Sequence, residues 1–152
     1  MAGISSYGSY GLAALYELAL HYGQGHLQIR DIAEKANIPQ NYLEQILATL
    51  RKEGLIQSIR GAGGGYLLAK APNAIAVFEI LVALEGELCN PTDERLQPIL
   101  HLYWDRIRED MKNVFHETLQ DLVDQGNALV RRGNREGAHG HDADVHLVIF
   151  GL

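Results

Sequence analysis

The chain has 152 residues, of which 47% are hydrophobic and only four are prolines. This composition excludes a disordered chain and predicts a folded globular protein, either one compact domain or a small domain with a dimerisation arm. No stretch approaches the ~20 apolar residues that span a bilayer, and no signal-peptide pattern opens the chain, so we expect no membrane partner. The single cysteine, Cys89, excludes an intrachain disulfide and favours the reducing cytoplasm as the location.

The formal charge of −6 is distributed unevenly along the chain. Residues 1–72 hold six Lys/Arg and five Asp/Glu, which gives +1, so the remaining residues carry −7. The nearly neutral N-terminal half predicts only modest attraction to phosphates. Binding to a nucleic acid would therefore depend on symmetry and dimerisation.

The first predicted element is a helix that begins at a Ser5 or Ser6 cap and ends near Tyr22. Serine is a favoured N-cap because its side-chain oxygen accepts a hydrogen bond from an unpaired N–H of the first turn. The residues expected to be buried recur at helical spacing: Leu12, Leu15, Tyr16, Leu18 and Ala19.

A second, shorter helix is predicted from Ile29 to Ala36. Arg30 and Lys35 point outward, where the first helix of a helix-turn-helix crosses the phosphate backbone, although a solvated surface explains Lys35 equally well. Asn37 tolerates the left-handed conformation and is expected to turn the chain into the next helix.

The third predicted helix is amphipathic and ends near Lys52. Pro39 is tolerated in its first turn, and Gly54 falls where a helix end favours a left-handed residue. Amides near its start and cations near its end would suit the major groove of DNA. Its apolar face holds Leu43, Ile46, Leu47 and Leu50, and the opposite face holds Gln40, Asn41, Glu44, Gln45, Ala48, Arg51 and Lys52.

A glycine-tipped hairpin follows that helix, with apolar runs from Leu55 to Arg60 and from Tyr66 to Ala69. Arg60 stands at the edge of the tip, where it could enter a narrow minor groove, and Gly61 would allow close approach of the backbone. A helix followed by such a hairpin is the winged helix-turn-helix arrangement. From spacing alone, the alternative is a surface helix and a flexible turn in another α+β domain.

Three more helices are predicted in the C-terminal half, over Ala74–Leu84, Asp93–Val114 and Thr118–Val130. The second would be about 33 Å long, and its apolar stripe would need a second chain to cover it, so we expect a homodimer. After a polar break at 131–137, the tail alternates histidine and aspartate. It could bind a transition metal or be a loosely packed terminus, and its polar residues are His139, His141, Asp142, Asp144 and His146.

The sequence contains no enzyme signature, so we expect a protein that is not an enzyme. The segment GAGGG is not a phosphate loop, because no Gly-Lys-Ser/Thr follows it, and its spacing does not fit the dinucleotide fingerprint. Cys89 has no catalytic base beside it in sequence, and neither HExxH nor a nucleophile elbow occurs.

Several short stretches between residues 31 and 86 together carry a family resemblance. They are Asp31-Ile32-Ala33-Glu34, Tyr42-Leu43-Glu44-Gln45, Leu50-Arg51-Lys52, Gly54-Leu55, Arg60-Gly61, Gly63-Gly64-Gly65-Tyr66-Leu67-Leu68, Ile75-Ala76-Val77 and Leu84-Glu85-Gly86. In this order they resemble the Rrf-two (Rrf2) family of bacterial transcription regulators. The resemblance implies a mainly α fold with a small β-wing: a winged helix-turn-helix domain over 1–86, a sensor loop and dimerisation helices over 87–130, and a tail over 131–152.

The resemblance also implies a homodimer that binds double-stranded DNA at a pseudo-palindromic operator. Gln45 would contact base edges, Tyr42 and Arg51 the DNA backbone, and Arg60 the minor groove, while Glu44 would tune sequence preference. The expected DNA-binding residues are Gln40, Asn41, Tyr42, Glu44, Gln45, Arg51, Arg60 and Gly61.

One departure from the family leaves an alternative open. The family usually has basic residues near the start of the first helix, where this chain has Gly3, Tyr7 and Ser9. This difference and the acidic balance favour a winged-helix protein–protein interaction module without DNA binding.

The resemblance raises the question of an iron–sulfur cluster, because sensors in the family hold one with three cysteines and one further ligand. Cys89 and His101 match the first cysteine and a histidine ligand, but residues 92–98 contain no further cysteine. Iron–sulfur clusters commonly take four thiolates. A conventional cluster is therefore not expected, and a response to redox state, iron or sulfur stays open. The alternatives are an unusual one- or two-cysteine cluster or metal site at these residues, or a purely structural role for both.

Overall fold

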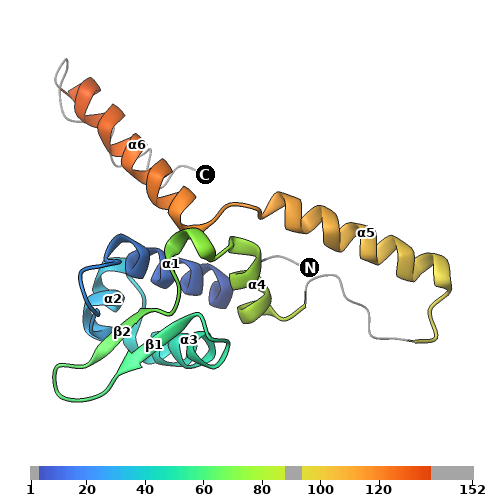
Figure 1. Ribbon diagram of the computed structural model, residues 1–152, viewed down its shortest axis with the longest axis horizontal. Coiled ribbons are helices and arrows are strands. Elements are labelled where there is room, and N and C mark those ends of the chain that lie inside the picture. The colour runs from blue at the N-terminus through green and yellow to red at the C-terminus, as the bar shows by residue number, and fades with distance from the viewer. Residues whose placement is uncertain (1–3, 88–93, 138–152) are drawn as a thin grey trace.

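The computed structural model describes residues 4–87 and 94–137, which form a winged-helix domain and two projecting helices (Figure 1). This architecture confirms the predicted mainly α fold with a small β-wing. The elements are α1 (Ser6–Leu20), α2 (Ile29–Ala36), α3 (Gln40–Lys52), β1 (Ile56–Ile59), β2 (Gly65–Leu68), the 3-10 helix η1 (Pro72–Ala74), α4 (Val77–Glu85), α5 (Pro98–Val114) and α6 (Leu119–Gly137).

Helix α1 lies at the centre of the winged domain and contacts α2, α3, α4, α6 and β2. It begins as predicted, because the Ser5 hydroxyl accepts a hydrogen bond from the Gly8 N–H at the helix start. Around it lies one hydrophobic core. Each fully buried leucine or isoleucine stabilises the domain by about 1.5–3 kcal/mol. The largest of these side chains are Leu15, Ile32, Leu43, Ile46, Leu47, Leu50, Leu55, Ile75, Ile80 and Leu119.

The turn from α2 into α3 agrees with the sequence pattern. Asn37 adopts the left-handed conformation, with φ 54° and ψ 50°, and Gly54 follows the end of α3 with φ 75°. Pro39 is the N-cap of α3 rather than a residue of its first turn. The Pro39 carbonyl accepts hydrogen bonds from the N–H groups of Tyr42 and Leu43, so the helix itself begins at the next residue, Gln40.

Strands β1 and β2 are antiparallel, and Ile56 pairs with Leu68 at the base of the hairpin. A third extended segment adds to β2, because Leu27 and Tyr66 exchange two backbone hydrogen bonds of 2.9 and 2.8 Å. Gly65 lies against this segment with no room for a side chain: a Cβ there would be 2.6 Å from the carbonyl carbon of Leu27. The loop between α1 and α2 therefore braces the wing.

Helix α4 begins three residues later than the sequence predicts. Residues 75 and 76 are extended, because the chain here pairs with residues 117–119 through hydrogen bonds from Val77 N–H to the Glu117 carbonyl and from Leu119 N–H to the Ile75 carbonyl. Residues 117–119, at the start of α6, therefore hydrogen-bond with backbone that helical periodicity alone would place inside α4.

The ends of the last two helices also differ from the predictions. Helix α5 begins at Pro98 rather than Asp93, because proline suits the first turn of a helix and disfavours a helical residue before it. Helix α6 continues to Gly137, beyond the expected end near Val130, since arginine and glutamate are strong helix formers. The predicted domain boundaries at 86 and 130 stay predictions.

The start of α6 is set by a capping box. The Thr118 N–H donates to the Asp121 carboxylate at 2.8 Å, and the Asp121 N–H donates to the Thr118 hydroxyl at 3.2 Å. These hydrogen bonds with Thr118 hold the pKa of Asp121 below its usual value. Further along, a Cβ at Gly126 would overlap the hydroxyl of Tyr16 in α1, so α6 packs closely on α1.

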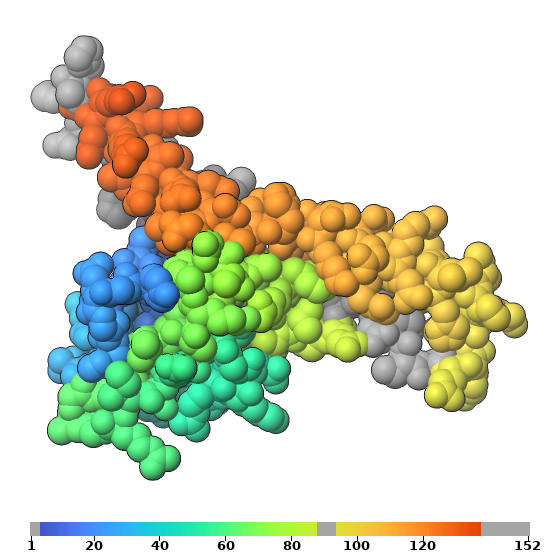
Figure 2. Space-filling model, viewed as in Figure 1, coloured from blue at the N-terminus to red at the C-terminus, as the bar shows by residue number. Residues whose placement is uncertain are grey.

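Helices α5 and α6 extend from the winged domain in different directions (Figure 2). No residue of α5 is buried, and Ile99 and Leu102 are 69% and 65% exposed. On α6, Leu129 and Val130 are also exposed. The predicted histidine-rich tail lies outside the described residues. Within them, no helix is both long and apolar enough to cross a membrane.

Candidate nucleic-acid interface

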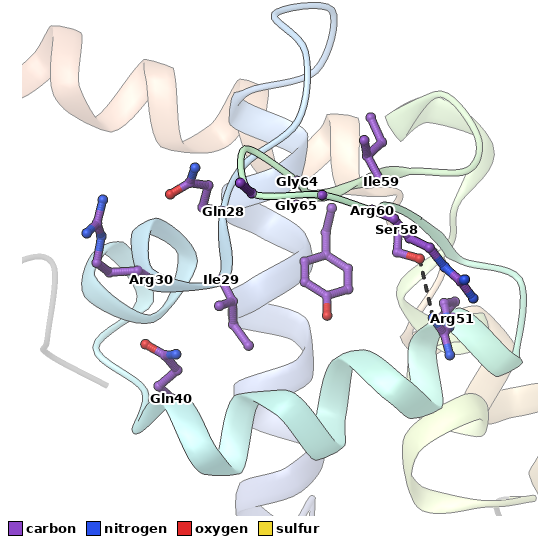
Figure 3. A pocket seen from close by; sticks show the side chains of 13 residues that line it. Gln28, Ile29, Arg30, Gln40, Arg51, Ser58, Ile59, Arg60, Gly64 and Gly65 are labelled. Carbon is purple, nitrogen blue, oxygen red and sulfur yellow. Dashed lines mark hydrogen bonds between the residues drawn. The ribbon is translucent and has the colours of Figure 1, made fainter.

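An open groove runs between the wing, the start of α2 and the outer side of α3; we call it the wing groove (Figure 3). The wing supplies one wall through β1, β2 and the glycine-rich tip, and the two helices supply the other. The lining residues are Gln28, Ile29, Arg30, Gln40, Arg51, Ser58, Ile59, Arg60, Gly61, Ala62, Gly64, Gly65 and Tyr66.

Three arginines from three different elements reach the wing groove. The guanidinium of Arg51 donates to the hydroxyl of Ser58 at 3.3 Å, which ties the end of α3 to β1 (Figure 3). Arg30 and Arg60 are exposed, and the side chain of neither makes a hydrogen bond or ion pair with the residues that the structure describes. None of the described lining residues is acidic. Such a groove can bind a polyanion through several phosphate contacts at once.

The wing tip has a defined backbone despite its glycine content. Gly61 has φ 114°, a conformation that a side chain would strain, and its carbonyl accepts a hydrogen bond of 3.0 Å from the Gly64 N–H. His26, in the loop before α2, hydrogen-bonds through Nε2 to the Gly63 carbonyl. The tip that carries Arg60 is therefore held from outside the hairpin as well as within it.

Replacing His26 with alanine should loosen the wing tip without unfolding the domain. A single hydrogen bond is worth about 0.5–1.5 kcal/mol, so we expect amide exchange at Gly64, whose N–H donates to the Gly61 carbonyl, to accelerate up to about tenfold. Hydrogen exchange read by NMR measures this, with His21→Ala as a matched histidine control. Equal exchange rates in the two variants would contradict a clamp at His26.

The structure divides the sequence-predicted DNA-binding residues into three groups. Gln40, Arg51, Arg60 and Gly61 line the wing groove. Exposed positions on α3 outside the groove lining are occupied by Asn41, Glu44 and Gln45. The ring of Tyr42 is half-buried and packs edge-on against Tyr7 and Tyr10, at centroid distances of 6.0 and 5.6 Å.

Sequence reasoning missed several residues that support the interface. Tyr7 hydrogen-bonds to α3, Glu85 binds the start of α1, and His26 holds the wing tip. Gln28 and Ser58 line the wing groove itself. Their partners lie far away in sequence or on another element, so no local motif marks them.

Comparison with known proteins decides the family. Residues 4–125 match the model of the Rrf2 family, described as iron-dependent transcriptional regulator. This chain belongs to the Rrf2 family. Over 123 residues, this Rrf2 protein is 42% identical to the HTH-type transcriptional regulator CymR of Bacillus subtilis, covering 79% of the chain and 88% of the relative. It is 36% identical over 140 residues to the HTH-type transcriptional regulator IscR of Erwinia tasmaniensis, covering 84% and 82%.

Solved structures agree with this assignment. CymR, the global cysteine regulator of B. subtilis, aligns with a TM-score of 0.69 at 40% identity, covering 82% of this chain and 98% of that one. IscR of T. potens aligns with a TM-score of 0.65 at 30% identity, covering 95% and 96%. This Rrf2 protein is thus a winged helix-turn-helix transcriptional regulator, which confirms the resemblance and fits the expectation that it is not an enzyme.

The donor set for an iron–sulfur cluster does not fit the conventional pattern. The whole chain has one cysteine, whereas the common cluster takes four thiolates. Cys89 lies outside the described residues, and His101 is half-buried on α5. In the described part of the chain, no three His, Cys, Asp or Glu side chains are grouped to hold a metal ion.

Proposed function

We propose that this Rrf2 protein regulates transcription by binding double-stranded DNA as a homodimer, at an operator with two-fold symmetry. The observation that carries the proposal is the wing groove, which Arg30, Arg51 and Arg60 line and whose described lining residues include no acidic side chain. The Rrf2 family match and the regulator relatives support the same function.

Helix α3 would enter the major groove. Asn and Gln side chains can donate and accept hydrogen bonds at the edge of adenine, and Gln40, Asn41 and Gln45 are exposed along α3. Glu44, also exposed, can accept a hydrogen bond from the amino group of cytosine. Arg51, near the C-terminal end of α3, would contact a phosphate and position the helix.

The wing would reach the adjacent minor groove. Narrow minor grooves at A/T-rich sequences have an enhanced negative potential that attracts arginine. Arg60 is exposed beside Gly61, whose lack of a side chain would let the backbone approach the sugar edges.

A homodimer would present two such surfaces to one duplex. Helix α5 carries four exposed apolar side chains near its start, at residues 99–103, and one at its end, Val114, and a second copy of α5 would cover them. A two-fold dimer matches two half-sites separated by about one helical turn of DNA, or a multiple of it.

We also propose that the regulated process concerns iron, sulfur or redox state. The family description and the name of the B. subtilis relative support this. A sensor built on a conventional cluster is disfavoured by the single cysteine. Iron and sulfide analysis of protein purified without oxygen tests whether a cluster is present. Stoichiometric amounts of both would show that the protein holds one despite its single cysteine.

Selection of duplexes from a random library tests DNA recognition directly. The wild-type protein should enrich a two-fold symmetric sequence. Replacing Arg60 with alanine should then lower affinity for that duplex about tenfold or more, with the larger loss at A/T-rich flanks, because the minor-groove contact is removed. A gel-shift titration at fixed salt measures both quantities.

Arg132→Ala is the matched control, because Arg132 is exposed on α6 and does not line the wing groove. If Arg60→Ala binds with wild-type affinity and flank preference, Arg60 has no minor-groove role. If the wild-type protein enriches no sequence, the winged-helix domain instead fits a protein–protein interaction module.

A further inference from the structure

We infer that Tyr7 is a positioning residue for DNA recognition, because its hydroxyl holds the backbone of α3 at the turn from which Gln45 projects. This inference rests on the proposed function of α3 as the DNA-reading helix. Tyr7 belongs to α1, which does not line the wing groove. It would therefore act through α3 rather than on DNA.

The hydroxyl of Tyr7 makes two contacts with α3. It donates to the carbonyl of Gln45 at 3.1 Å and lies 2.5 Å from the hydroxyl of Thr49. The Thr49 hydroxyl is also within hydrogen-bond distance of the Gln45 carbonyl, at 3.3 Å. The two hydroxyl protons can satisfy any two of these three contacts at once, and in each of the three arrangements Tyr7 is bound to α3.

This link constrains the part of α3 that faces DNA in the proposed complex. The Gln45 side chain is exposed, while its carbonyl accepts the hydrogen bond from α1. If α3 rotates about its axis, Glu44 and Gln45 move relative to Arg60 on the wing. Hydrogen bonds to base edges weaken steeply with distance and angle, so a small rotation would reduce sequence discrimination.

The start of α1 is itself held by Glu85, the last residue of α4. Its carboxylate accepts hydrogen bonds from the Ser5 N–H at 2.9 Å, the Ser5 hydroxyl at 2.6 Å and the Gly8 N–H at 3.1 Å. A negative charge is favourable at a helix N-terminus. Because Glu85 occupies these donors, the start of α1 is fixed from within the protein, and Tyr7 is fixed with it.

Tyr10 provides a natural comparison. Tyr7 and Tyr10 both pack edge-on against Tyr42 of α3, so both rings contribute to the contact between α1 and α3. The Tyr10 hydroxyl, in contrast, makes no hydrogen bond with the described residues. Removing one hydroxyl at a time therefore separates the hydrogen bonds to α3 from the packing of the rings.

The experiment compares Tyr7→Phe with Tyr10→Phe on three probes. These are a duplex selected by the wild-type protein, single-base variants of its half-sites, and an unrelated duplex of equal length. For Tyr7→Phe we expect discrimination between the first two probes to fall about threefold to tenfold, with binding to the unrelated duplex unchanged. Tyr10→Phe should match the wild type. Thr49→Val should have a smaller effect than Tyr7→Phe, because the Tyr7 hydroxyl can still donate to the Gln45 carbonyl.

A double-mutant cycle with Gln45→Ala measures the coupling between Tyr7 and Gln45 in base discrimination. No such coupling is expected if Tyr7 only stabilises the fold. If Tyr7 acts through Gln45, then Tyr7→Phe should change discrimination little once Gln45 is alanine. The inference fails if Tyr7→Phe discriminates as well as Tyr10→Phe, or if it loses binding to all three probes equally. Failure of the wild-type protein to select any duplex would overturn the proposed function and this inference together.

Discussion

Replacing Gly65 with alanine is expected to lower the free energy of unfolding by about 2–3 kcal/mol and to abolish sequence-specific DNA binding. The new Cβ would meet the backbone carbonyl of Leu27, which cannot rotate away as a side chain can. Relief requires separating Leu27 from Tyr66 and losing their two backbone hydrogen bonds. The wing would then move away from α3, and Arg60 would no longer line the wing groove.

Thermal unfolding followed by circular dichroism measures the stability change, which should appear as a fall in Tm of about 5–10 °C. Gly63→Ala is the matched control in the same loop, because a Cβ at Gly63 would meet no atom within 4 Å. It should leave Tm and DNA binding close to wild type. If both variants unfold at the same temperature, the close approach of Gly65 to Leu27 does not determine the position of the wing.

A charge placed on the exposed surface of α5 is expected to dissociate the proposed homodimer. Leu102 is 65% exposed, and no residue of α5 is buried within a single chain. In the proposed dimer, Leu102→Glu would place a carboxylate in each half of an apolar interface, so the dimer dissociation constant should rise at least about 100-fold. Tight binding to a symmetric operator should be lost, because a monomer contacts only one half-site.

Analytical ultracentrifugation over a concentration series measures this dissociation. Glutamate forms helices nearly as well as leucine, so the helix itself should persist. Gln125→Glu, at an exposed position on α6, adds the same charge away from α5 and should remain dimeric. A wild-type protein that is monomeric at micromolar concentration, or a Leu102→Glu variant that dimerises like wild type, would rule out α5 as the dimer interface.

The candidate site was only partly predictable from the sequence. The exposed amides of α3 and the arginine beside the wing tip follow from local periodicity and from glycine spacing. The wing groove depends also on Gln28 and Arg30, which precede α3 in the chain and which the fold brings into the same groove as Arg60. Tyr7 and Gln45 are 38 residues apart, and Ser5 and Glu85 are 80 apart, so no periodic pattern could pair them.

By itself, the sequence determined the helices α1 to α3, the left-handed turn at Asn37 and the existence of the hairpin. These features depend on hydrogen bonds and side-chain preferences between residues only a few positions apart, so short-range sequence patterns are enough to predict them. Only the tertiary structure decided where α4 begins, why Gly65 must be glycine, and which side chains share the wing groove. Those outcomes depend on which backbone groups and surfaces meet across the fold, because distant segments compete for the same hydrogen bonds and the same space.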